Sequence, residues 1–145
     1  MKISRYFDAA VLKPEMTREE ARKAIQESID ADSYSVCVRG CDIEMAVEMC
    51  RGTNTIVSCV LDFPYGYGGA AAKRALAKIY CQQGAKELDM VMNYGYARGG
   101  DWDAVEEEIR GVVEEAHAAG ALVKVIFETS QLTLEQVRVA TEVSI

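Results

Sequence analysis

Lys86-Glu-Leu-Asp-Met-Val-Met-Asn93 has the pattern of a β-strand with a carboxylate at its centre. Side chains alternate across a strand, so the apolar Leu88, Met90 and Met92 share one face and Asp89 lies on the other. The apolar face needs cover from helices. On the opposite face a buried carboxylate is costly unless it is paired or used in chemistry.

A second stretch, Ala121 to Thr129, repeats this arrangement and places Lys124 on its polar face. If the two strands are neighbours, Asp89 and Lys124 point into the same interior. Such a carboxylate can shuttle protons, and a buried lysine with a lowered pKa can attack a carbonyl. A buried ion pair that only fills a polar layer fits the same pattern. From the pattern alone, Lys124 is the candidate nucleophile.

The chain alternates strand and helix five times, about one unit per 29 residues, the size of a βα repeat with short loops. The expected strands cover residues 7–12, 35–38, 55–63, 86–93 and 121–129. The helices that follow them are expected to begin at Thr17, Asp42, Ala70, Asp101 and Thr133, and Thr17 and Thr133 each open a capping box. Strict alternation predicts parallel strands with right-handed crossovers.

Two α/β architectures fit this alternation, a doubly wound open sheet and a (β/α)8 TIM barrel. A doubly wound sheet has helices on both faces, so its central strands should be apolar on both sides. Here one face carries Asp8, Asp89, Lys124 and Glu128, which favours a barrel interior. A whole barrel needs about 200 to 250 residues. We therefore predict a single domain over residues 1–145 that forms an incomplete TIM barrel of five βα units.

Composition excludes several classes of function. A net charge of −7 argues against a nucleic-acid partner. No apolar run reaches the 18 residues of a membrane span, and no apolar segment of the kind found in signal peptides follows the basic start. These features indicate a cytoplasmic protein with no membrane partner.

The five cysteines are an odd number, contain no Cys-x-x-Cys, and have only His117 to assist them. We expect free thiols in a reducing compartment rather than disulfides or a metal site. Cys37 is expected to be a small core residue that could line a pocket, because His117 is a poor candidate for its base. The acidic run that includes Glu108 is interpreted as a solvated helix face; its members are Glu106, Glu107, Glu108, Glu114 and Glu115.

The loop Gly66-Tyr-Gly-Gly-Ala-Ala71 fits the dinucleotide fingerprint Gly-x-Gly-x-x-Gly/Ala. Two expected strands precede it, although the fingerprint normally opens its fold, and Pro64 lies inside the turn. Nucleotide binding is therefore a weaker alternative than a small, mobile loop.

Six short motifs, in order, resemble those of the deoxyribose-phosphate aldolase family, class I aldolases on a TIM barrel. They lie at residues 7–14, 35–38, 62–66, 84–91, 100–103 and 122–129, and include Asp-Phe-Pro-Tyr-Gly and Lys-Glu-Leu-Asp-Met-Val. The resemblance implies cleavage of 2-deoxy-D-ribose 5-phosphate, a sugar phosphate, to glyceraldehyde 3-phosphate and acetaldehyde. A lysine Schiff base performs this reaction, and no cofactor is implied.

By position in these motifs, Asp89 matches the aspartate of the family's proton relay, and Lys124 matches a lysine that supports it. We list both as catalytic, and Asp8 and Cys37 as substrate-binding. The family's Schiff-base lysine lies one strand later, in a Lys-Thr-Ser-Thr-Gly segment that this sequence lacks. The chain by itself is therefore expected to be inactive.

Four positions depart from the family pattern. Ala9 and Ala10 replace His-Thr, Arg39 replaces an asparagine, and Asp62 replaces a glycine. Because these positions lie near the active end, a related sugar-phosphate or keto-phosphate aldolase stays open. A truncated, non-catalytic barrel also stays open, and its exposed strand edges would invite self-association. We expect a homo-oligomer.

Overall fold

The computed structural model describes residues 2–145, and its centre is one parallel sheet of five strands in the order β1-β2-β3-β4-β5. The strands are β1 Asp8–Val11, β2 Ser35–Val38, β3 Ile56–Leu61, β4 Glu87–Val91 and β5 Leu122–Ile126. In the register of β4 and β5, Asp89 lies opposite Lys124. All five predicted strands are present; β2 has its predicted bounds, and the other four are shorter than predicted.

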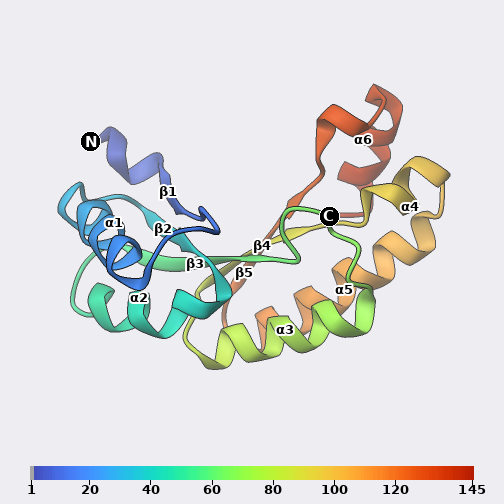
Figure 1. Cartoon of the computed structure of the whole chain (residues 1–145). Coiled ribbons are helices and arrows are strands. Elements are labelled where there is room, and N and C mark those ends of the chain that lie inside the picture. The colour runs from blue at the N-terminus through green and yellow to red at the C-terminus, as the bar shows by residue number, and fades with distance from the viewer. Residues whose placement is uncertain (1) are drawn as a thin grey trace.

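Among the residues that the structure describes, six α-helices connect or follow the strands. Figure 1 shows how they are arranged around the sheet. They are α1 Arg18–Asp30, α2 Ile43–Cys50, α3 Ala70–Gln82, α4 Tyr94–Gly99, α5 Trp102–Ala118 and α6 Leu134–Glu142. Three 3₁₀ turns cover Ile3–Tyr6, Gly40–Asp42 and Thr129–Gln131. None of the described helices is long and apolar enough to cross a membrane.

Local signals set most of the helix starts. The capping boxes at Thr17 and Thr133 both form, with reciprocal hydrogen bonds to Glu20 and Gln136. Asp42 precedes α2 as expected, but its carboxylate makes no capping hydrogen bond. The sequence did not predict α4, a six-residue helix with weak propensity that begins where the Asn93 side chain accepts the Tyr96 N–H.

The sheet is strongly curved. β1 and β5 are its two edges, yet the Lys124 ammonium of β5 lies 2.7 Å from a carboxylate oxygen of Asp8 in β1. In a flat sheet, four strand spacings would separate these strands by about 19 Å, too far for the two side chains to span. The sheet must therefore curl so that its edges face each other across a concave interior, as in a barrel.

The two faces of the sheet differ as predicted from the alternation. Leu88, Met90 and Met92 are fully buried on the convex face, where α3 and α5 lie side by side beneath the sheet (Figure 1). The opposite face carries the polar side chains, and no described helix covers it. A doubly wound sheet would have helices on both faces and a reversal in strand order, so that alternative is wrong.

One prediction about the helices is also wrong. Glu108 of α5 was assigned to a solvated acidic face, but its side chain is 1% exposed and bonds Lys73 of α3. The neighbouring Glu107 is exposed as expected. The helical period places Glu108 toward α3, where a buried cation stabilises it.

Candidate active site

The concave interior contains one ammonium group surrounded by three carboxylates. The Lys124 Nζ lies 2.7 Å from Asp8, 2.8 Å from Glu87 and 3.2 Å from Asp89. These groups come from the two edge strands and from β4, so the curvature of the sheet creates the cluster. The predicted pairing of Asp89 with Lys124 is confirmed.

Lys124 is held in its charged form. Partial burial opposes the charge, but hydrogen bonds to Asp8 and Glu87 and the nearby Asp89 raise the pKa of Lys124 above its ordinary value. A lysine nucleophile needs a neutral amine and hence a lowered pKa. The interpretation of Lys124 as the nucleophile, which the pattern alone had favoured, therefore has no electrostatic support.

Asp89 has the opposite tendency. Its burial raises the pKa of its carboxyl group, and the attraction of Lys124 offsets this only in part. The Cys37 thiol donates a long hydrogen bond of 3.5 Å to Asp89 Oδ2. A raised pKa brings a carboxyl group closer to the range in which general acid–base catalysis is efficient.

Asp8 anchors the far side of the cluster. Burial alone would raise its pKa, but hydrogen bonds from Lys124 and Ser35 together lower the pKa of Asp8 below its ordinary value. The Ser35 hydroxyl donates to Asp8 at 2.6 Å and lies 3.3 Å from the hydroxyl of Ser58. Asp8 is therefore a firmly ionised partner of Lys124.

Cys37 lines the interior but is not activated. Burial raises the pKa of its thiol to about 12, so the thiol stays protonated at neutral pH. His117 lies exposed in the last turn of α5, in the outer helix layer, and does not assist Cys37. Cys37 is available as a small, weak donor next to Asp89.

Glu87 belongs to the cluster although no role was predicted for it, and Glu128 does not lie where the alternation predicts. Glu87, with a side chain only 5% exposed, contacts Lys124, and its position two residues before Asp89 was the signal that it shares that face. Glu128 was expected on the interior face. It instead lies in the turn after β5 with a left-handed backbone, and its carboxylate accepts a hydrogen bond from Ser130.

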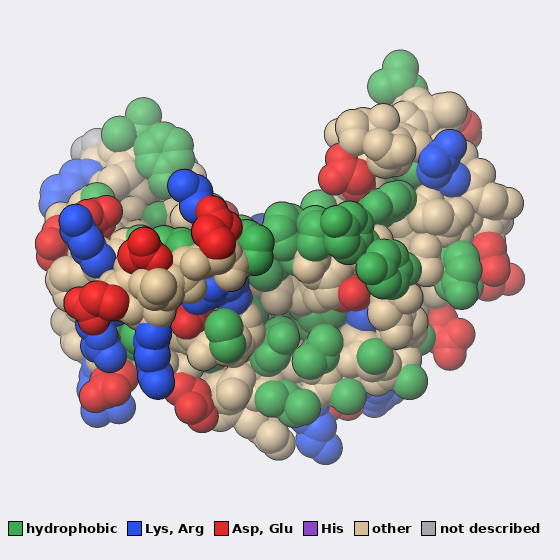
Figure 2. Space-filling view, in the orientation of Figure 1, with side chains coloured by type: hydrophobic (Ala, Val, Ile, Leu, Met, Phe, Trp, Pro, Cys, Tyr) green, Lys and Arg blue, Asp and Glu red, His purple; other side chains and the backbone are tan. Residues whose placement is uncertain are grey.

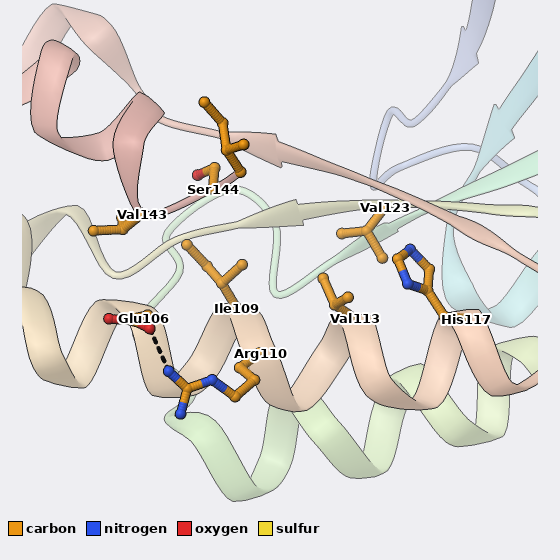
Figure 3. A pocket seen from close by; sticks show the side chains of 9 residues that line it. Glu106, Ile109, Arg110, Val113, His117, Val123, Val143 and Ser144 are labelled. Carbon is orange, nitrogen blue, oxygen red and sulfur yellow. Dashed lines mark hydrogen bonds and ion pairs between the residues drawn. The ribbon is translucent and has the colours of Figure 1, made fainter.

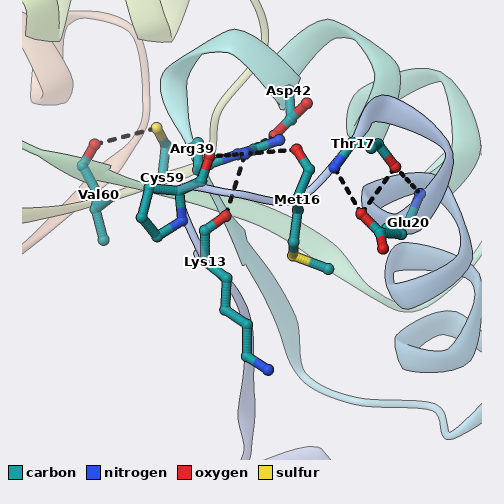
Figure 4. A network of polar contacts seen from close by, with 9 residues as sticks. Lys13, Met16, Thr17, Glu20, Arg39, Asp42, Cys59 and Val60 are labelled. Carbon is teal, nitrogen blue, oxygen red and sulfur yellow. Dashed lines mark hydrogen bonds and ion pairs between the residues drawn. The ribbon is translucent and has the colours of Figure 1, made fainter.

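The family departure at Arg39 has a structural use. Its guanidinium bonds Asp42 at 2.7 Å and donates to the carbonyls of Lys13, Pro14 and Met16 at 3.1–3.3 Å (Figure 4). Arg39 thereby joins the loop after β1 to the start of α2. Its charge serves this loop rather than the cluster around Lys124.

The departure at Asp62 also serves a loop. Asp62 has a left-handed backbone, and its carboxylate accepts the Gly68 N–H at 2.7 Å. A side chain on Gly66 would meet the Met92 carbonyl oxygen at 2.2 Å, so this glycine allows the loop to pack against the end of β4. The glycines therefore position a loop on the sheet, which argues against the dinucleotide alternative.

Several cavities lie outside the cluster. One, of about 300 Å³, lies between α5 and residues 143–145 and is lined by apolar side chains such as Ile109, Val113 and Val123, with an ion pair between Glu106 and Arg110 at its rim (Figure 3). Another, of about 620 Å³, lies among the loops that follow β1, β2 and β3 and is bordered by α3. This second cavity opens at the carboxyl ends of the strands, where barrel enzymes place their sites.

Curated proteins with similar sequences are deoxyribose-phosphate aldolases. The chain is 37% identical over 143 residues to a deoxyribose-phosphate aldolase of Lactiplantibacillus plantarum, covering 99% of this chain and 66% of that protein. It is 41% identical over 136 residues to that of Streptococcus sanguinis, covering 94% and 61%. The chain therefore spans less than two thirds of the length of these relatives. No family profile matches the chain.

The fold agrees with the sequence comparison. The tetrameric deoxyribose phosphate aldolase from Aeropyrum pernix superposes with a TM-score of 0.87 at 26% identity. The match covers 97% of this chain and 58% of that one. The five βα units therefore have the arrangement found in a solved aldolase barrel, in agreement with the predicted fold.

Proposed function

This chain belongs to the deoxyribose-phosphate aldolase family, and on that premise we propose that it forms part of a Schiff-base aldolase. The proposed substrate is 2-deoxy-D-ribose 5-phosphate, and the products are glyceraldehyde 3-phosphate and acetaldehyde. The observation that carries the proposal is the Lys124 ammonium held among three carboxylates in the concave interior, one of them Asp89, whose pKa is raised by burial.

In the proposed reaction, a lysine amine outside the five βα units attacks the substrate aldehyde and expels water to form an iminium ion. The C2–C3 bond then breaks, and its electrons move into the iminium to form an enamine. The C3 hydroxyl loses its proton and becomes the aldehyde of glyceraldehyde 3-phosphate. Protonation of the enamine and hydrolysis release acetaldehyde.

The residues of this chain are assigned to proton transfer and orientation. Asp89 moves protons through bound water, which its raised pKa supports. Lys124 keeps Asp89 in place and stays charged because Asp8 and Glu87 share it. Cys37 and Asp8 line the space next to Asp89, which supports the assignment of substrate contacts to them.

Assembly and location are part of the same proposal. The deoxyribose phosphate aldolase from Aeropyrum pernix is tetrameric, which supports a homo-oligomer for the complete protein. The five cysteines all carry free thiols, which supports a reducing, cytoplasmic location.

The test supplies the missing βα units in trans. The chain is co-expressed with the part of the Lactiplantibacillus plantarum relative that it does not match, and cleavage of 2-deoxy-D-ribose 5-phosphate is measured. We expect activity from the pair and none from the chain alone. Asp89→Asn should lower turnover by about 10²- to 10⁴-fold. Asp103→Asn, an exposed carboxylate on α5, is the matched control and should have no effect.

Borohydride trapping locates the Schiff base. A covalent adduct is expected on the supplied segment, whereas an adduct on Lys124 would overturn the assignment of roles. Activity toward another sugar phosphate or a keto-phosphate, but not toward deoxyribose phosphate, would favour a related aldolase. A folded pair inactive on every substrate would favour a non-catalytic barrel.

A further inference from the structure

A second charged cluster lies on the helix-covered side of the sheet; the side chains of Lys73 and Glu108 are almost fully buried, and that of Asp62 is 18% exposed. Lys73 of α3 is 0% exposed, and its Nζ lies 2.8 Å from Glu108, 2.9 Å from the Val91 carbonyl oxygen and 3.5 Å from Asp62. The Lys73 ammonium donates to the Val91 carbonyl and pairs closely with Glu108, while Asp62 is a more distant ionic partner. Glu108 uses its other oxygen to accept the backbone N–H of Asn93.

The partners of this cluster lie at the carboxyl ends of two neighbouring strands. Val91 and Asn93 follow Asp89 along the same chain segment, while Asp62 follows Val60 by two residues. Val60 is the residue that lies opposite Asp89 in the register of β3 and β4. The cluster therefore connects the carboxyl end of β4, the strand that contains Asp89, to the carboxyl end of the neighbouring β3.

The loop after β3 is held at the same point. Asp62 accepts the Gly68 N–H at 2.7 Å, and the close approach of Gly66 to the Met92 carbonyl packs the loop onto the end of β4. Both Lys73 and Glu108 reach this point from the helix layer. The contacts of Lys73 and Glu108 are thus concentrated on the end of β4, close to the cluster around Lys124.

Stability alone is a weak reason for such an arrangement. The cost of removing two charges from water commonly equals or exceeds their attraction, and apolar residues of similar size often replace a buried ion pair without loss. Lys73 and Glu108 bond specific backbone atoms, the Val91 carbonyl and the Asn93 N–H. Such a pair is better explained by the backbone geometry that it imposes than by its contribution to stability. Here that geometry is the position of the end of β4.

We propose that Lys73, Glu108 and Asp62 are positioning residues that hold the end of β4, and with it Asp89, in the geometry needed for proton transfer. The inference rests on the proposed function, since it assigns the relay to Asp89. None of the three residues touches the interior cluster, so each acts through the backbone. Misplacement of a catalytic group by about 1 Å can cost on the order of 10²-fold in rate.

The test replaces the charged pair by apolar side chains of similar size, Lys73→Met with Glu108→Leu, in the 145-residue chain. The carboxyl pKa of Asp89 is measured by NMR titration, and hydrogen exchange is measured at Asn93. We expect faster exchange at Asn93 and a fall in the pKa of Asp89 toward its ordinary value, because water reaches it more easily. The matched control is Arg74→Gln with Glu115→Gln, which removes an exposed pair between the same helices and should change neither.

Enzyme kinetics add a second readout in the pair assembled with the supplied βα units. The double variant should lower kcat by about 10- to 100-fold with little change in KM. Glu108→Gln keeps an acceptor for the Asn93 N–H and should give a smaller change in the same direction. The single variant Glu108→Gln also tests the proposal if the double variant does not fold.

The outcomes separate the two proposals. If the unmodified pair is inactive, the proposed function fails, but the titration of Asp89 in the chain alone still decides the positioning role. If the variants lower stability while the Asp89 pKa and kcat stay unchanged, the cluster has only a structural role and the inference is overturned.

Discussion

Three carboxylates share one ammonium at the centre of this molecule, so Lys124 is the residue on which the interior depends. Its removal would leave Asp8, Glu87 and Asp89 facing one another without a cation. Like charges at close range in a partly desolvated site repel strongly. Asp8 and Asp89 differ in what they contribute to stability, because the pKa of Asp8 is lowered and that of Asp89 is raised.

Lys124→Met is expected to lower the free energy of unfolding at pH 7 by about 3 kcal/mol, because it leaves partly buried carboxylates unpaired. The loss should shrink as the pH falls and these carboxylates become protonated. Urea unfolding across pH 4 to 7 measures it. Lys78→Met, an exposed lysine on α3, is the control, and an equal effect from both variants would contradict the prediction.

Asp8 and Asp89 should respond to pH in opposite ways. The lowered pKa of Asp8 contributes stability above the ordinary value of 3.8, and this is lost as the pH falls through the folded-state pKa. The raised pKa of Asp89 means that the folded protein holds that proton more tightly. Its contribution is therefore present below 3.8 and lost as the pH rises through its folded-state pKa.

We therefore expect Asp8→Asn to destabilise the chain at pH 7 by about 1 kcal/mol, the size of a partly exposed charged hydrogen bond. Asp89→Asn should not destabilise it at that pH. Urea midpoints of the two variants, measured between pH 3.5 and 7, make the comparison. A greater loss from Asp89→Asn at pH 7 would show that the signs are reversed.

The loops and helices around the sheet are fixed by side chains that satisfy backbone groups. Arg39 is the clearest example, because a single guanidinium accounts for three carbonyl groups of the loop after β1. At position 39, the departure from the family pattern therefore changes which side chain fixes the loop after β1. Asp62 has the same kind of role in the loop after β3.

Arg39→Met should free the loop between β1 and α1. We expect a loss of about 2 kcal/mol in the free energy of unfolding, since the hydrogen bonds are charge-assisted but partly exposed. Hydrogen exchange should accelerate in residues 12–17 and not in β4. Arg51→Met, an exposed arginine just after α2, should leave both unchanged, and loop exchange that stays slow in Arg39→Met would refute the role.

The whole molecule is an open trough. Figure 2 shows hydrophobic side chains in the hollow between its two raised ends. In the part of the chain that the structure describes, β1 and β5 each pair with only one neighbour, so each has an outer edge of unpaired backbone groups. Exposed edges of this kind are templates for pairing with another chain.

We expect the isolated chain to self-associate with increasing concentration, because pairing at the edges satisfies their backbone groups. Sedimentation velocity over a dilution series measures this. Adding the unmatched part of the Lactiplantibacillus plantarum relative should convert the self-associated chains into complexes that contain equal numbers of the two chains. A single monomeric species at all concentrations would contradict the prediction.

Much of the fold, and the position of its polar face, could be predicted from local sequence. The alternation around Asp89 indicated which face is polar, the capping boxes marked α1 and α6, and the spacing of units predicted a parallel sheet. These features depend on neighbours within a few residues, whose geometry the backbone repeats impose. The same alternation places Glu87 on the face of Asp89, but it does not show that Glu87 contacts Lys124.

Only the tertiary structure determined which charges meet. Asp8 and Lys124 are 116 residues apart and lie on opposite edges of the sheet, and only its curvature brings them together. Lys73 and Glu108 were each ordinary polar positions on helices until α3 and α5 packed side by side and enclosed them. The pKa of a carboxyl group depends on burial and on distant partners, and neither quantity is encoded in the periodicity of one segment.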